Sequence, residues 1–149
     1  MRTIDRVRRS GIGIGADRTV REAAAIMDEA GVGALVVVDG ERPVGIVTDR
    51  DLVRRALARG YPFDARVDAV MTVPVFTIDA DADVHEAYGL FRAHGIRRLA
   101  VVGEAGRFVG MLGVDDLLID LAAELADLAG PIIAETATAH RDSQVPATA

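Results

Sequence analysis

An internal repeat is the feature of this 149-residue chain that most restricts how it can fold. Shifting the sequence by 64 residues aligns identical residues, and one extra residue in the second half then moves the offset to 65. The matched pairs are Val20/Val84, Glu22/Glu86, Ala23/Ala87, Gly31/Gly95, Leu35/Leu99, Val37/Val101, Val38/Val102, Val44/Val109, Gly45/Gly110, Asp51/Asp116 and Leu52/Leu117. A single unit of this length buries too little apolar surface to form a good hydrophobic core, so the two copies are expected to pack together.

Each copy has the same hydrophobic pattern: a short apolar run, a helical stripe, two β-branched runs around a polar turn, and a second helix. The first copy is predicted to form strands at 12–14, 34–38 and 44–47 and helices at 20–30 and 49–59. The second is predicted to form strands at 75–78, 99–102 and 108–112 and helices at 83–94 and from 114 onwards. The pattern predicts an α+β fold made of two β-α-β-β-α units.

The predicted boundaries are a first repeat at 1–60, a linker at 61–69, a second repeat at 70–129 and a C-terminal extension at 130–149. The helical pattern weakens after Gly130 and Pro131, and the polar stretch HRDSQVPATA is expected to be a loose tail. The basic residues Arg2, Arg6, Arg8 and Arg9 are interpreted as a solvated, partly frayed terminus.

Composition excludes several classes of protein. The net charge of −6 disfavours a general nucleic-acid binder. No apolar run approaches the roughly 18 residues needed to span a bilayer, so membrane insertion is not expected. The chain has no cysteine and no secretion signal is recognisable, which fits a location in the reducing cytoplasm.

The stretch PVGIVTDRDL places Thr48 three residues before Asp51, where an apolar strand gives way to a helix. On these residues alone, the spacing is close to the Ser/Thr-x-x-Glu capping box, and helix capping is the simpler interpretation. The alternative is that the same two residues hold a ligand.

In order and spacing, four motifs of this chain resemble a pair of CBS domains, also called a Bateman module, from about Val7 to Leu128. The motifs are GIVTDRDL, GMLGVDDLL, MTVPVFTID and GIRRLAVV. The resemblance implies two repeats packed through their sheets with pseudo-twofold symmetry, and two clefts able to accept adenine nucleotides. It further implies a free-standing regulatory protein that senses AMP, ADP, ATP or a related adenosyl ligand and signals to an effector that the sequence does not identify. The ligand's phosphate count and any magnesium requirement stay open.

The family motif in the first copy is complete, with Gly45, Thr48 and Asp51. An ionised Asp51 can accept hydrogen bonds from both ribose hydroxyls, and Thr48 can donate to a phosphate. In the second copy Gly113 replaces the Thr or Ser, although Gly110 and Asp116 are retained, so the second cleft is ranked below the first. Arg97 and Arg98 are predicted phosphate ligands, because guanidinium groups donate paired hydrogen bonds to phosphate.

Other residues are assigned by position within the implied module. Apolar walls for an adenine are predicted, with ordinary core packing as the alternative for each member. These residues are Ile12, Ile14, Val36, Val75, Ile78 and Ala100. The glycines Gly45, Gly110 and Gly113 are interpreted as positions where a ligand or a bulge needs close approach to the backbone.

An enzyme is not expected, because His85, His94 and His140 are scattered and no nucleophile or metal-ligand spacing is recognisable. The stronger alternative is an interaction or stress-response protein of the same fold that binds no nucleotide. The resemblance also implies a homodimer. The leucines along the last predicted helix leave apolar surface for such a contact or for another partner.

Overall fold

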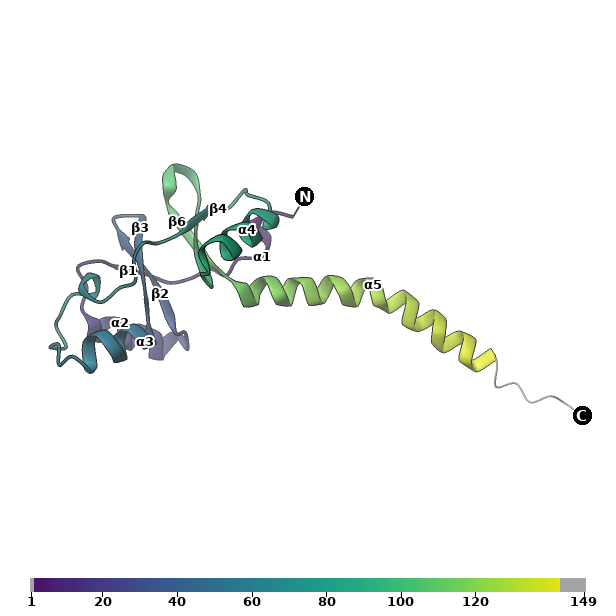
Figure 1. Ribbon diagram of the computed structural model, residues 1–149, viewed down its shortest axis with the longest axis horizontal. Helices are drawn as coiled ribbons and strands as arrows, with labels where there is room; N and C mark the ends of the chain where they lie inside the picture. The colour runs from purple at the N-terminus through teal and green to yellow at the C-terminus, as the bar shows by residue number, and fades with distance from the viewer. Residues whose placement is uncertain (1, 143–149) are drawn as a thin grey trace, which may run out of the picture.

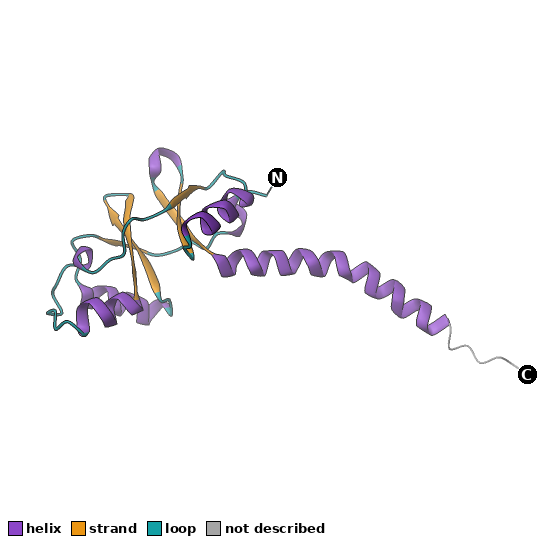
Figure 2. Ribbon diagram, in the orientation of Figure 1, coloured by secondary structure: helices purple, strands orange, loops and turns teal. Residues whose placement is uncertain are grey.

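The computed structural model describes residues 2–142 and contains two three-stranded sheets of the same topology, each flanked by helices (Figures 1 and 2). In the first repeat the central strand β2 pairs in parallel with β1 and antiparallel with β3. The elements are β1 (Gly13–Gly15), α2 (Val20–Ala30), β2 (Ala34–Asp39), β3 (Arg42–Thr48), α3 (Asp49–Asp51) and the π-helical stretch η1 (Leu52–Leu57). The predicted α+β class is confirmed.

The second repeat reproduces this arrangement, with β5 between a parallel β4 and an antiparallel β6. Its elements are β4 (Thr77–Asp79), α4 (Val84–His94), β5 (Arg98–Val102), the short 3-10 turn η3 (Glu104–Gly106), β6 (Phe108–Gly113) and α5 (Val114–Asp142). Two elements precede the repeats: α1 (Ile4–Val7) before the first and the 3-10 turn η2 (Val67–Ala69) before the second.

Local sequence signals set the ends of the first helix of each repeat. Thr19 and Glu22 form a complete capping box at the start of α2, and Asp83 accepts a hydrogen bond from the backbone of His85 at the start of α4. Both helices end at a glycine in the left-handed region, Gly31 with φ 65° and Gly95 with φ 61°. The helices therefore present their apolar stripes to the sheets at the same register in both repeats.

Each repeat has its own core, and each core is completed by the segment that precedes the other repeat. Val67 and Val70, from the predicted linker, are fully buried in the core of the first repeat. Ile4, from the N-terminus, is fully buried in the core of the second. Backbone bonds from Ile4 to the carbonyl of Ala82 and from Val67 to the carbonyl of Arg18, at 2.9 and 2.8 Å, fix these crossings.

The expectation of a frayed N-terminus is therefore wrong for the described residues. Arg2 forms ion pairs with Asp120 and Glu124 on α5, and Arg8 donates to the carbonyl of Val109 at 2.8 Å. The basic residues pair with the acidic start of α5 and with a strand edge in the second repeat, contacts that are far apart in the sequence.

The helical structure also extends further than predicted, because α5 continues through Gly130 and Pro131 to Asp142. It projects away from both sheets and bends in its second half (Figure 1). Proline removes one backbone hydrogen bond and bends a helix, but the alanines and leucines before Pro131 and the three alanines after it favour helix. The rest of the predicted tail, 143–149, lies outside the described residues.

Candidate functional site

Thr48 and Asp51 form the capping box that their spacing predicts. The Thr48 hydroxyl accepts a hydrogen bond from the backbone N–H of Asp51 at 3.1 Å, and the Thr48 N–H donates to the Asp51 carboxylate at 3.0 Å. Together the two bonds satisfy donors at the start of α3 that the helix itself leaves unpaired.

The Asp51 carboxylate has two further partners, one from the start of the second repeat and one in the helical stretch η1 that follows Asp51. The hydroxyl of Thr72 lies 3.1 Å from both carboxylate oxygens, and Arg55 Nε lies 3.7 Å from Oδ1. Asp51 is only 9% exposed. The segment that carries Met71 and Thr72 thus covers the acid of the first copy.

Asp116 has a corresponding set of contacts in the second copy, but its partners differ in chemistry. Gly113 N–H donates to its Oδ2 at 2.8 Å, as Thr48 N–H does to Asp51. Its Oδ1 accepts from Arg9, whose Nη2 is also 3.8 Å from a carboxylate oxygen of Asp115. The hydrogen bond and charge of Asp116 raise the pKa of Arg9 above its ordinary value, so this arginine stays charged.

A cleft of about 530 Å³ lies beside Asp116, within the range typical of small-molecule sites. The first repeat contributes its β1 entry and the loop before β2, whereas the second repeat contributes the loop before β5 and the start of α5. The lining residues are Arg9, Gly11, Ile12, Gly31, Val32, Gly33, Ala34, Arg97, Arg98, Met111, Val114, Asp115, Asp116 and Leu118. Arg97 and Arg98 therefore share one cleft with Asp116.

Comparison with known proteins identifies the family, because the model of the CBS domain matches residues 7–58 and 67–123. The chain belongs to the CBS domain family. It is 37% identical over 118 residues to the uncharacterised protein YlbB of Bacillus subtilis, covering 78% of each chain. An uncharacterised protein of Methanopyrus kandleri, MK0525, is 37% identical over 102 residues, which are 67% of this chain but only about half, 52%, of that protein.

Solved CBS structures have the same fold. The CBS domain protein PAE2072 from Pyrobaculum aerophilum, complexed with AMP, superposes with a TM-score of 0.68 at 29% identity. The match covers 81% of this chain and 98% of that one. The architecture expected from the four motifs, a tandem pair of CBS repeats, is confirmed.

The cleft of about 530 Å³ lies beside the incomplete CBS motif, which the comparison of the two motifs ranks second as a ligand site; that ranking stays a prediction. Both acids are largely covered, since the side chain of Asp51 in the complete motif is 11% exposed and that of Asp116 in the incomplete motif is 9% exposed. Asp116 lines the cleft, and Asp51 is not among its lining residues. The hydroxyl of Thr48 is used for capping in the first copy, and the backbone N–H of Gly113 holds Asp116 in the second. A side chain at Gly113 would collide with the carboxylate of Asp115, so the glycine suits this conformation.

The predicted adenine walls divide into two groups. Ile12 lines the cleft, but Ile14 and Ile78 belong to the two hydrophobic cores. Val36 and Ala100 are fully buried within the central strands, and Val75 is half-buried outside the lining of the cleft. Ile14 and Ile78 thus show the alternative of ordinary core packing, whereas a contact of Val36, Ala100 or Val75 with an adenine stays a prediction.

At two of the three predicted glycines, Gly45 and Gly110, another segment of the chain itself passes close to the backbone. A Cβ at Gly45 would collide with the side chain of Met71, and one at Gly110 would collide with the backbone of Arg9. These glycines admit the two crossing segments, and a register shift lies beside each, between Val37 and Val38 and between Val101 and Val102.

Sequence reasoning missed Arg9, Val32 and Met111 as residues of the cleft. The repeat offset contains a signal for the first, since it aligns Arg8 and Arg9 with Thr72 and Val73 in the segments that precede the first strands. Both segments place a donor on an acid at the start of a helix, Thr72 on Asp51 and Arg9 on Asp116.

Within residues 2–142, no group of three or more His, Cys, Asp or Glu side chains is placed to bind a metal ion. Across the same part of the chain, no helix has the length and apolar character to cross a bilayer.

Proposed function

We propose that this CBS pair is a regulatory module that binds an adenosyl ligand, such as AMP, ADP, ATP or a related compound, in the cleft beside Asp116. The observation that carries this proposal is the combination of the Asp116 carboxylate, three arginines and apolar side chains in a single cleft of about 530 Å³, whose lining also includes the carboxylate of Asp115. Those are the groups that a ribose, a phosphate and a purine base require.

Each part of the ligand has an assigned partner. The Asp116 carboxylate accepts hydrogen bonds from the ribose hydroxyls, and Arg97 and Arg98 donate to the phosphates. Ile12, Val32 and Met111 contact the base. The AMP complex of the related Pyrobaculum aerophilum protein supports this ligand class.

Arg9 is the group that has to move when the ligand binds. Its side chain is largely exposed, whereas that of Asp116 is 9% exposed, so the arginine can leave the carboxylate at little steric cost. Ribose hydroxyls then replace its hydrogen bond to Asp116, and the freed guanidinium is available to a phosphate. Ligand binding is thereby coupled to the N-terminal segment, which joins the two repeats.

The proposed role is binding and signalling without catalysis, in the cytoplasm, as a homodimer that acts on an effector protein. The alternative is an interaction or stress-response protein of the same fold that binds no nucleotide. The closure of the Asp51 region by Met71 and Thr72 favours this alternative for the first copy.

Thermal unfolding in the presence of AMP, ADP, ATP, NADH and S-adenosylmethionine, each tested alone, distinguishes the two functions. A ligand at about one hundred times its dissociation constant stabilises the folded state by roughly 2.7 kcal/mol, which raises the Tm by several degrees. Guanosine monophosphate is the matched control for the base. If the folded protein shows no shift with any adenosyl compound, the binding proposal is refuted and the interaction protein is left.

A further inference from the structure

Between Leu118 and Ile132, α5 has a largely exposed apolar face that no other described part of the chain covers. Leu118, Leu121, Leu125, Leu128 and Ile132 recur at alternating spacings of three and four residues, which places them on one side of the helix. Leu125 and Leu128 are 66% and 71% exposed, and Ile132 and Ile133 are similarly exposed. The CBS match ends at residue 123, so most of this face lies beyond the family repeat.

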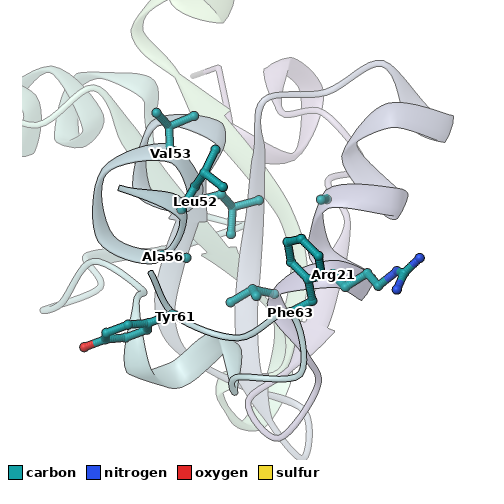
Figure 3. A pocket seen from close by; sticks show the side chains of 9 residues that line it. Arg21, Leu52, Val53, Ala56, Tyr61 and Phe63 are labelled. Carbon is teal, nitrogen blue, oxygen red and sulfur yellow. The ribbon is translucent and has the colours of Figure 1, made fainter. Parts of the chain in front are cut away.

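A second apolar surface lies at the opposite end of the molecule, between α2 and η1. It is a groove of about 330 Å³. Figure 3 shows Leu52, Val53, Tyr61 and Phe63 around it, with Arg21 at its edge. Val53, Leu57 and Phe63 are more than half exposed, and the Arg21 guanidinium lies 5.9 Å from the centre of the Phe63 ring.

The two surfaces are framed by opposite charges. The residues from α3 to the end of η1 and just beyond include four arginines, Arg50, Arg54, Arg55 and Arg59, against two aspartates. Helix α5 carries seven acidic residues, Asp115, Asp116, Asp120, Glu124, Asp127, Glu135 and Asp142, against one arginine. An acidic helix with an apolar face complements an apolar groove with a basic frame.

The same charges disfavour the pairing of two α5 helices with each other. Two copies of a strongly acidic helix placed side by side bring like charges together, at a cost that salt screens only in part. Within one chain α5 cannot reach the groove, because it leaves the second repeat in the direction away from α2 and α3 (Figure 1).

We infer that α5 of one copy docks in the groove between α2 and η1 of a second copy of this chain. In a twofold dimer each copy gives one helix and one groove, so the contact occurs twice and the assembly closes. Eight large apolar side chains in each copy are exposed on these two surfaces. Those on the groove and on the Leu118–Ile132 face of α5 are Val53, Leu57, Tyr61, Phe63, Leu118, Leu125, Leu128 and Ile132.

Burying these side chains gives an interface of adequate size. At about 60–120 Å² for each large apolar side chain, the two contacts bury roughly 1,000–1,900 Å², which overlaps the area of a stable protein–protein interface. This inference deepens the homodimer of the proposed function by naming its surfaces, and it does not depend on ligand binding.

Sedimentation-velocity ultracentrifugation of the full chain tests it. The unaltered protein is expected to be a dimer at micromolar concentration. The double variants Leu125→Ser/Leu128→Ser, on the helix, and Arg54→Glu/Arg59→Glu, at the groove, are each expected to raise the dimer dissociation constant at least tenfold. Arg42→Glu, at the exposed β2–β3 turn, is the charge control and leaves association unchanged. Circular dichroism confirms that each variant is folded.

A charge exchange then separates this interface from the alternatives. Adding Glu135→Arg to the Arg54→Glu/Arg59→Glu chain restores opposite charges across the contact and is expected to recover part of the lost affinity. If only the helix variant Leu125→Ser/Leu128→Ser raises the dimer dissociation constant, α5 pairs with α5 of the other copy. If neither double variant changes the dissociation constant, the dimer uses another face. Either result overturns the inference but leaves the homodimer. A monomeric parent protein overturns both, and ligand binding by that monomer would still support the sensor.

Discussion

The hydroxyl of Thr72 lies 3.1 Å from both carboxylate oxygens of Asp51, although the two residues belong to different repeats. Asp51 is nearly buried, and its other contacts are the N–H of Thr48 and the more distant Arg55. The pair therefore joins the start of the second repeat to the helix entrance of the first, at the position where the sequence alone predicts a ribose.

Replacing Thr72 with valine keeps the shape of the side chain and removes the donor. The nearly buried carboxylate then lacks one hydrogen bond, and we expect the free energy of unfolding to fall by about 1–2 kcal/mol. Urea unfolding measures the change, and Thr77→Val, at an exposed position of β4, is the matched control. Equal stability of the two variants would mean that the Thr72 hydroxyl contributes nothing to the fold.

The sequence predicts the repeated part of the fold well, because the signals there are local. Helix caps at Thr19 and Asp83 and stop signals at Gly31 and Gly95 fix each helix, and alternating β-branched runs fix the strands. The alignment of the two copies at an offset of 64 residues then allows the helices and strands predicted in one copy to be predicted in the other. It does not predict which copy of the motif is left open to ligand.

That choice depends on contacts between residues far apart in the chain. Met71 and Thr72 cover the acid of the first motif, and the exposed side chain of Arg9 covers the acid of the second. These segments are reached through chain crossings that leave no periodic pattern in the sequence. The continuation of α5 past Pro131 was missed for a different reason. A local rule against proline in helices was outweighed by the propensity of its neighbours.

The capping box of α2 predicts a pH dependence of stability. The pKa of Glu22 is lowered, first by its hydrogen bond with Arg18 and also by the backbone N–H of Thr19. A carboxyl whose pKa is lower in the folded state stabilises the fold above its unfolded pKa, near 4.5, and this stabilisation is lost as the pH falls through the folded value.

Glu22→Gln is therefore expected to lower stability at pH 7 and to reduce the loss of stability between about pH 5 and pH 3. Urea midpoints measured across this range test the prediction. Glu29→Gln, an exposed position on the same helix, is the control. If the difference between Glu22→Gln and the unaltered protein stays constant with pH, the ion pair has no role in the acid sensitivity.

The arginines in the cleft predict a dependence on the number of phosphates. Arg97 and Arg98 are exposed at the mouth of the cleft, where added phosphates extend towards solvent. We expect Arg97→Gln/Arg98→Gln to weaken ATP binding by about tenfold or more, roughly 1.4 kcal/mol, and AMP binding by less. Raising the salt concentration should also weaken ATP binding more than AMP binding, because salt screens each contact between an arginine and a phosphate.

Isothermal titration calorimetry at two salt concentrations measures both effects. Arg107→Gln, an exposed arginine on the β5–β6 connection that pairs with Glu41, is the control for general charge. Equal losses for AMP and ATP would place both arginines on the α-phosphate or away from the ligand.

The two acids at the helix entrances give the sharpest test of where the ligand binds. Asp116 lines the open cleft and can exchange Arg9 for a ribose, whereas Asp51 is enclosed by Thr72 and lies outside that cleft. Asp116→Ala is therefore expected to weaken AMP binding by tenfold or more, whereas Asp51→Ala changes it less than about threefold. Because both residues also cap helices, the unfolding of each variant without ligand has to be measured first, and calorimetry carried out well below its Tm. The reverse order of losses would mean that Met71 and Thr72 move aside and that the complete motif of the first copy holds the ligand.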